Sequence, residues 1–337
     1  MYRPTSLWTW AFVGVACVQA AIILGFEAYV FATFQTSLKN DATRQTASHT
    51  IPTFLTLYIF GFLYQLLLAY DALRLKNTIQ IIGLCVFNAA LLLYAAVQIE
   101  QIQDAVHALL IINDIDNNVW SDTKAFLIAI PCIIAVGTVL LSFVAWKLYD
   151  EFAWTIYKHI SADLRMKRRY LTFQIYIALL KFDFFLFIGF TIQFVVIVVK
   201  RDDIEFWLTI AAIPVTILIL IMAGVFTRRE NRLGMASVII LYFVALAYFL
   251  FKLVRMYQPR FEGTFLPVRK SLTTFAVITI ILIIATIINA VMCTMNFGKG
   301  LKPHIAGRKM ESEDEKTFVT EMPNLSHGPV PSRMTID

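Results

Sequence analysis

Long apolar runs alternate with short polar connectors along the chain as far as about residue 295. A transmembrane helix needs roughly 20 apolar residues, because each residue adds about 1.5 Å and the hydrocarbon core is about 30 Å thick. This pattern predicts an all-α, polytopic transmembrane bundle in one domain over residues 1–295. A seven-span arrangement, with one run re-entrant or peripheral, is the alternative. The eight runs that meet the required length lie at about 8–34, 52–70, 78–98, 125–146, 173–199, 206–226, 235–254 and 272–294.

Composition supports a membrane-embedded chain rather than a soluble one. Of the 337 residues, 59% are hydrophobic and 15% are charged, whereas an ordinary soluble domain carries about 25% charged residues. Lipid offers backbone amides no partner, so only helices or closed barrels can span it. The runs lack the apolar–polar alternation of a barrel strand. The longest connectors, residues 99–124 and 147–172, are too short for a separate catalytic domain.

The chain turns polar from residue 296 onward. Residues 296–337 are rich in proline, serine and threonine and include an acidic run at 311–315. Such a segment cannot bury enough apolar surface to fold alone. We therefore predict a disordered cytosolic tail. Within it, Ser312 precedes three acidic residues and is a candidate phosphosite for an acidophilic kinase.

Basic residues indicate the orientation of the spans and a contact with anionic lipids. In an eight-span arrangement, lysine and arginine are in excess on the side that carries both termini, which predicts that both lie in the cytosol. The net charge of +6 comes largely from these clusters at span ends. It therefore predicts contact with anionic lipids at the cytosolic face and no nucleic-acid partner. The densest cluster is Arg165, Lys167, Arg168 and Arg169, which follows an apolar stripe in the connector 147–172. We interpret this segment as a helix that lies on the leaflet or continues a span, and a topological stop of positive charge is the alternative.

Charged residues inside spans are costly and are therefore functional candidates. Asp183 is too short to reach the interface, so we expect it to face the bundle or a water-filled cavity. One hypothesis is that Asp183 lines a polar pathway together with Gln193 or Asn289. Lys181 is long enough to extend to the cytosolic interface, and Glu27 lies towards the luminal half of the first span. A structural role is the alternative for each of these residues.

Two further polar and small-residue patterns lie inside the spans. Amides can form hydrogen bonds between helices, and packing is the favoured interpretation for Gln19, Gln65, Asn88, Gln193 and Asn289. Cys17, Ala21 and Gly25 form a small-residue face on the first span. Such a face suits close helix approach, either within the bundle or in a helix-mediated homo-oligomer.

No motif of enzymatic chemistry stands out. The five histidines are scattered without metal-ligand spacing, and the chain carries no glycine-rich phosphate loop or nucleophile motif. The sequence therefore predicts no catalytic residue, no metal site and no cofactor. The connector 99–124 is acidic and includes Asp114 and Asp116, which leaves a membrane-embedded transferase that uses this connector as an alternative.

One tract of the chain resembles a known family. It runs from Lys147 to Tyr170 and continues through Gln174–Tyr176 to Lys181–Phe185. Here the sequence resembles an uncharacterised fungal family of multi-spanning Golgi apparatus membrane proteins. The resemblance covers the whole layout of spans and is most distinctive over 147–194. It implies a polytopic helical fold in the Golgi membrane and carries over no catalytic or ligand-binding residue.

These observations favour a non-enzymatic, multi-pass Golgi or endomembrane protein that transports a small solute or lipid or acts in trafficking. A seven-span receptor-like protein, whose basic connector 147–172 binds a cytosolic partner, is the second hypothesis. The membrane-embedded transferase is the third. The sequence identifies no solute, ligand or product.

Overall fold

The computed structural model describes residues 6–38, 46–111, 115–116, 118–159, 164–198, 204–258 and 269–299. Within these ranges, eight helices are long and apolar enough to cross a membrane, by length and composition. A short π-helix, η2 (Phe194–Val198), follows α5 directly. The predicted all-α fold with about eight spans is confirmed, whereas most of the predicted disordered tail lies outside the described residues. The helices are α1 (Leu7–Ser37), α2 (Thr46–Arg74), α3 (Thr78–Ile111), α4 (Val119–His159), α5 (Leu164–Gln193), α6 (Ile204–Arg229), α7 (Arg232–Met256) and α9 (Arg269–Met295).

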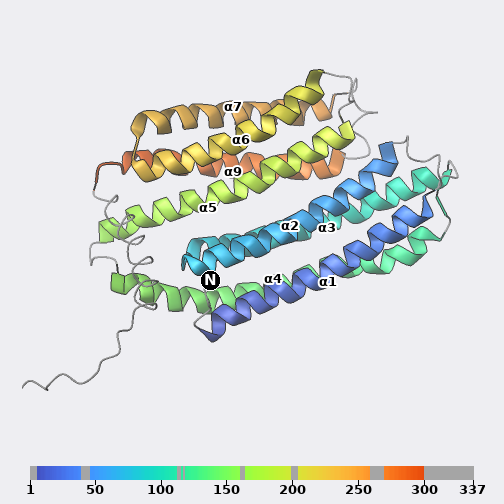
Figure 1. Cartoon of the computed structure of the whole chain (residues 1–337), viewed down its shortest axis with the longest axis horizontal. Helices are drawn as coiled ribbons and strands as arrows, with labels where there is room; N and C mark the ends of the chain where they lie inside the picture. Colours follow the sequence, from blue (N-terminus) through green and yellow to red (C-terminus); the bar gives the residue numbers. More distant parts are fainter. Residues whose placement is uncertain are drawn as a thin grey trace, which may run out of the picture.

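The eight helices form two four-helix units (Figure 1). In the first unit, α1 packs against α2 and α4, and α3 packs against the same two helices. In the second unit, α5 packs against α6 and α9, and α7 packs against the same two helices. Each unit is therefore a closed ring of helices that run up and down in chain order. The units meet where α2 and α3 contact α5, η2 and α9.

Short connections place the helix ends in two opposite groups. The end at which α1 begins also carries the α2–α3 and α6–α7 connections and the last turn of α9, on the left in Figure 1. We call it the basic end, because several arginines and lysines gather there: Arg74, Lys76, Arg228, Arg229 and Arg232. The other end is called the opposite end. Lys76 and Glu230 each adopt a positive φ, which closes the tight turns after α2 and α6.

Aromatic rings fill the contact between the two units. Phe185 of α5 lies 5.6 Å from Phe60, 5.6 Å from Tyr64 and 4.9 Å from Phe87, measured between ring centroids. Phe182 packs 5.8 Å from Phe87 on the same surface. Part of the tract that carries the family resemblance therefore forms the contact between the units.

Two helices extend well past their apolar runs. α3 continues to Ile111 and α4 to His159, so much of each long connector is helical. At the basic end, the Ser6 hydroxyl caps α1 and also donates a 2.7 Å hydrogen bond to Glu151 of α4. The segment after residue 147 thus continues the fourth span, which is one of the two interpretations that the sequence left open. Residues 160–163 lie outside the described part of the chain.

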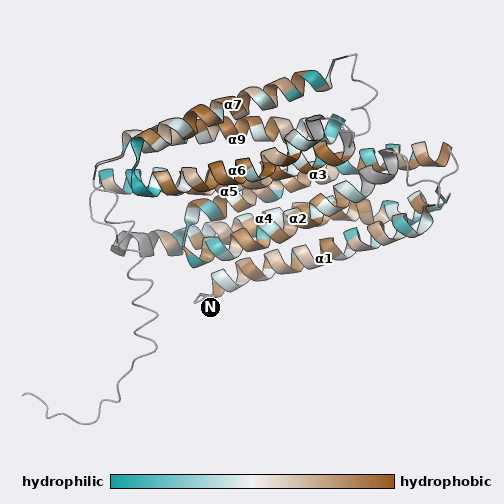
Figure 2. Ribbon diagram, turned by 45° about the horizontal axis from the view of Figure 1, so that its top comes forward, coloured by the Kyte–Doolittle hydropathy of each residue, from teal (hydrophilic) through white to brown (hydrophobic). Residues whose placement is uncertain are grey.

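The helices differ in how deeply they are buried within the protein. The most apolar windows of α2 and α5 are 56% buried within the protein, whereas those of α6 and α7 are 17% and 22% buried. Figure 2 shows hydrophobic residues along the middle of α6, α7 and α9 and hydrophilic residues at both ends of α7. The outer helices of the second unit, α6 and α7, therefore leave most of their apolar residues outside the protein interior, where lipid can contact them.

Candidate functional site

A hydrogen-bonded network lies at mid-depth inside the first unit and centres on Asn88 of α3. The Asn88 carbonyl oxygen accepts bonds from the amide nitrogens of Gln19 (2.8 Å) and Gln65 (3.1 Å). The Asn88 amide nitrogen donates a 2.8 Å bond to the Thr138 hydroxyl. Four helices therefore converge on one side chain, in agreement with the packing interpretation of these amides. The Gln19 and Gln65 carbonyl oxygens are buried without a partner.

A second polar cluster joins the two units at the basic end. The Lys181 ammonium of α5 forms an ion pair with Asp71 and donates a 2.8 Å hydrogen bond to the Gln80 carbonyl oxygen. The Gln80 amide nitrogen in turn donates to Asp71 and to the Leu68 backbone oxygen, at 3.0 Å each. Lys181 therefore does not simply extend into the interface. It binds the α2–α3 hairpin of the first unit to the second unit.

A third cluster joins the units at the opposite end. The Gln193 amide nitrogen donates to the Tyr94 hydroxyl (2.9 Å) and to the Ser271 hydroxyl (3.0 Å). Lys270 of α9 forms an exposed ion pair with Glu100 of α3. Gln193 is the last residue of α5 before the π-helix η2, and such local widening of a helix is frequent at functional sites.

Glu27 is completely buried in the interior of the first unit. Neither of its carboxyl oxygens has a hydrogen-bond partner. The Gln98 side chain of α3 lies beside it, and both side-chain polar atoms of Gln98 are buried and unpartnered as well. Glu27 therefore points inward and does not reach the membrane interface.

Asp183 is completely buried between α5 and α9 of the second unit. One carboxyl oxygen accepts a 2.7 Å hydrogen bond from the Thr286 hydroxyl, and the other has no partner. The Asn289 carbonyl oxygen, one turn further along α9, is also unpartnered. Gln193 lies ten residues from Asp183, which is about 15 Å along a helix. The structure thus brings Asp183 to Thr286 and Gln193 to Tyr94, so Asp183 and Gln193 do not meet.

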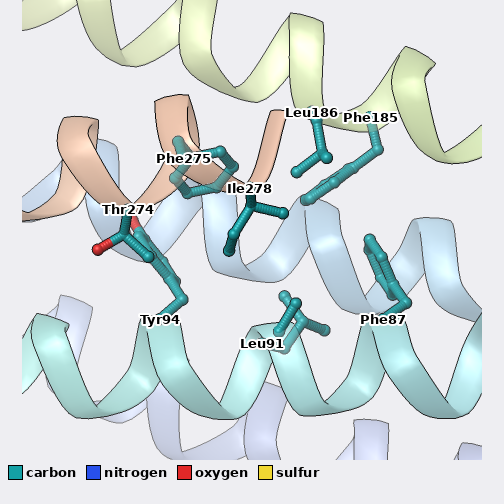
Figure 3. Close-up of a pocket in the computed structure, with 9 residues that line it drawn as sticks. Phe87, Leu91, Tyr94, Phe185, Leu186, Thr274, Phe275 and Ile278 are labelled. Atoms are coloured by element: carbon teal, nitrogen blue, oxygen red, sulfur yellow. The ribbon is translucent and has the colours of Figure 1, made fainter. Parts of the chain in front are cut away.

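A small cavity lies in the contact between the units (Figure 3). Its volume is about 20 Å³, which is room for roughly one water molecule. Phe87, Leu91 and Tyr94 of α3 face Phe185 of α5 and Phe275 of α9 across it. Apart from the Tyr94 and Thr274 hydroxyls the lining is apolar, and the cavity is too small to hold a solute larger than water.

The basic residues at the start of α5 are divided between surface and structural positions. Arg165 and Arg168 are exposed, and Lys167 is half-buried. The Arg169 guanidinium donates a 2.8 Å hydrogen bond to the Lys299 backbone oxygen, just after α9. Cations stabilise the carbonyl-rich end of a helix, so Arg169 contributes to holding the end of α9.

The remaining candidate residues make no contact that indicates a function, or lie outside the described residues. Cys17, Ala21 and Gly25 are exposed on α1, and nothing lies within 4 Å of a Cβ built on Gly25. Their small-residue face therefore points away from the bundle, and the homo-oligomer stays a prediction. Asp116 is exposed, whereas Asp114 and Ser312 lie outside the described residues. Among the described residues, no group of three or more histidine, cysteine, aspartate or glutamate side chains could hold a metal ion.

Sequence reasoning missed several residues of these clusters. Asp71 follows the second apolar run directly, and its pairing with Lys181 required the fold. Gln80 and Gln98 are intramembrane amides that the same rule as for Asn88 could have found. Lys252 of α7 is 3% exposed, with its ammonium 3.8 Å from the centroid of the Phe194 ring. A lysine inside a span is a usable signal, because an intramembrane charge needs a compensating contact.

Comparison with known proteins places the chain in a family. It is 34% identical over 314 residues to a UPF0658 Golgi apparatus membrane protein from Schizosaccharomyces pombe. The match covers 87% of this chain and 88% of that protein. No family model and no solved structure matches the chain. With this identity over most of both proteins, the chain belongs to the family of UPF0658 Golgi apparatus membrane proteins.

Proposed function

We propose that the protein is a carrier that moves a small polar solute across the Golgi membrane. The observation that carries this proposal is the pair of completely buried carboxyl side chains, Glu27 and Asp183. Each has at least one oxygen without a hydrogen-bond partner. A charged side chain at the centre of a span costs at least about 2.5 kcal/mol on insertion scales. Such groups are typical of substrate and proton pathways.

The two-unit architecture supports a carrier. Solute sites of carriers commonly lie where two helical units meet near the middle of the membrane. Here the contact is filled by aromatic rings around a small cavity, and polar clusters join the units at both ends. Such an arrangement corresponds to a closed state, and the solute would enter when one of the two clusters separates.

The experiment is solute uptake by the full chain reconstituted in vesicles of phosphatidylcholine and phosphatidylserine. Labelled amino acids, monosaccharides, nucleotides and inorganic ions are each offered under an imposed pH gradient. We expect one class to accumulate and uptake to stop when a protonophore is added. We expect Glu27→Gln and Asp183→Asn to lose uptake and the exposed-site control Cys17→Ser to keep it. Folded, inserted protein that accumulates none of these classes would contradict the proposal.

Golgi residence and orientation belong to the same proposal. Membership of a family of Golgi apparatus membrane proteins favours the Golgi membrane. The excess of basic residues at the basic end favours the cytosol for this end and for both termini. A tag after residue 337 should colocalise with Golgi markers and be digested by protease added outside intact Golgi vesicles. The sequon Asn324-Leu325-Ser326 should carry no glycan. A glycan found there would show that the C-terminus lies in the lumen and that the proposed orientation is wrong.

A further inference from the structure

A belt of polar side chains divides the interior of the first unit into two hydrophobic clusters. The larger cluster extends along α1 as far as Ile23 and along α3 as far as Ala95. The smaller cluster starts again at Val30 on α1 and at Ile102 on α3. Between them the buried residues are polar: Glu27, Gln98 and Gln101. The belt lies towards the opposite end, and the smaller cluster lies between it and that end.

The belt contains complementary polar atoms that lack partners. Both Glu27 oxygens and both side-chain polar atoms of Gln98 are buried without a hydrogen bond. A carboxylate has acceptors only, whereas a carboxylic acid has one O–H donor and one carbonyl acceptor. A primary amide also has a donor and an acceptor in matching positions. A neutral Glu27 can therefore donate to the Gln98 oxygen while the Gln98 nitrogen donates back, which satisfies all four atoms.

The surroundings favour a proton over a metal ion as the group that Glu27 binds. Among the side chains that the structure describes, the ionisable groups that face it from the packed helices are the hydroxyls of Tyr58 on α2 and Tyr94 on α3, within electrostatic range. On α4, Asp122 and Lys124 are exposed and point away from the belt. A calcium ion takes six to eight oxygen ligands, and magnesium requires octahedral coordination. Glu27 is the one carboxyl group of the belt, which is too few oxygen ligands for either metal ion. We therefore expect a proton to neutralise the Glu27 carboxylate.

We propose that Glu27 is the proton-binding residue of this protein, held as a neutral acid in a reciprocal pair with Gln98. The assignment rests on the proposed carrier function and names its coupling ion. On release, the O–H bond of Glu27 breaks, its electron pair stays on the carboxylate, and the proton passes to water or to the solute. The smaller cluster, with Val30, Phe34 and Ile102, closes the belt from the opposite end. Access to Glu27 from that end requires these side chains to separate.

The test is the infrared spectrum of the purified full chain at neutral pH, which needs no transport activity. A protonated carboxyl group absorbs at a carbonyl stretch distinct from that of a carboxylate. We expect an acid band that disappears in Glu27→Gln. In Gln98→Leu the same band should move to higher frequency, because the acid loses its hydrogen-bond partner. The Asp183→Asn variant identifies any contribution of the second buried carboxyl group.

The outcomes separate this inference from the carrier proposal. If Glu27→Gln removes a carboxylate band and no acid band, Glu27 is ionised and the inference fails, whether or not a solute is transported. If the acid band is present and Gln98→Leu leaves it in place, the pairing with Gln98 is wrong. A band that behaves as expected in a protein that accumulates no solute upholds the proton site and contradicts the carrier. The monodisperse elution of each variant in detergent checks that it is folded.

Discussion

The two four-helix units are built from similarly apolar helices, yet their interiors differ. The first unit holds a network of amides around Asn88 and the polar belt at Glu27. The second unit holds the buried carboxyl group of Asp183, which accepts one bond from Thr286. Its other buried polar contacts include Tyr176 with Tyr242 and Gln193 with Ser271, and α6 and α7 face mostly outward. In a bilayer the hydrophobic effect does not drive helices together, so hydrogen bonds and close packing hold them together. The difference indicates that one amide network joins all four helices of the first unit, whereas the polar contacts of the second unit are separate and smaller.

The largest expected difference in stability comes from replacing one asparagine in each unit by leucine. Asn88→Leu removes three interhelical hydrogen bonds. At about 0.6 kcal/mol each, and up to about 1.7, the loss should be roughly 2–5 kcal/mol. Asn289→Leu, in which the carbonyl oxygen has no partner, is the matched control and should lose less than about 1 kcal/mol. Unfolding by sodium dodecyl sulfate in mixed micelles measures both. Equal losses would show that the interiors do not differ in this way.

A second test compares a glycine in each unit. A Cβ on Gly137 would lie 1.9 Å from the Gln19 carbonyl oxygen, so Gly137→Ala must displace this side chain from the Asn88 network. We expect a loss of about 1–3 kcal/mol, the usual range for overpacking. In the second unit, a Cβ on Gly224 meets only Leu180, at 3.9 Å. Gly224→Ala should therefore leave the unfolding midpoint unchanged or raise it. A destabilised Gly224→Ala with an intact Gly137→Ala would reverse the comparison.

A third test asks whether the units depend on each other. Lys181→Met removes the ion pair with Asp71 and the bond to Gln80. Because both charged side chains are partly exposed, we expect a loss of about 1 kcal/mol rather than the larger loss of a fully buried pair. The double variant Lys181→Met with Asp71→Asn should lose less than the sum of the two single variants. Strict additivity of the two losses would mean that this cluster does not couple the units.

The smallest expected effect tests one polar contact within the second unit, the hydrogen bond between Thr286 and Asp183. Thr286→Val removes the hydroxyl that donates to Asp183, and we expect a loss of about 0.6 kcal/mol. Thr216→Val is the control, because its exposed hydroxyl bonds only to its own helix. The same unfolding assay should give a difference between the two variants. A loss as large as that of Asn88→Leu would mean that Asp183 is as important for the second unit as Asn88 is for the first.

The helices could be predicted from the sequence, whereas the clusters could not. Runs of about 20 apolar residues identify spans because bilayer thickness sets their length. Burial of Asp183 follows from its depth in a span, whereas that of Glu27, placed by the sequence in the luminal half of its span, required the fold. Their partners, such as Gln98 and Thr286, depend on helix rotation and on which helices are neighbours, and an apolar run carries little information on either. The small face of Cys17, Ala21 and Gly25 illustrates this, because it suits close approach and yet points outward.

The stacked rings between the units have a mechanical consequence. Phe60 and Tyr64 lie nearly parallel to Phe185, at interplanar angles of 20° and 16°, and Tyr64 lies at 26° to Phe184. Offset stacking is one of the two arrangements that aromatic pairs prefer, and stacked rings present flat faces to one another. We therefore expect relative motion of the units to be shear along these planes rather than rotation about a hinge. The polar clusters at Lys181 and at Gln193 would then limit how far the two units can slide.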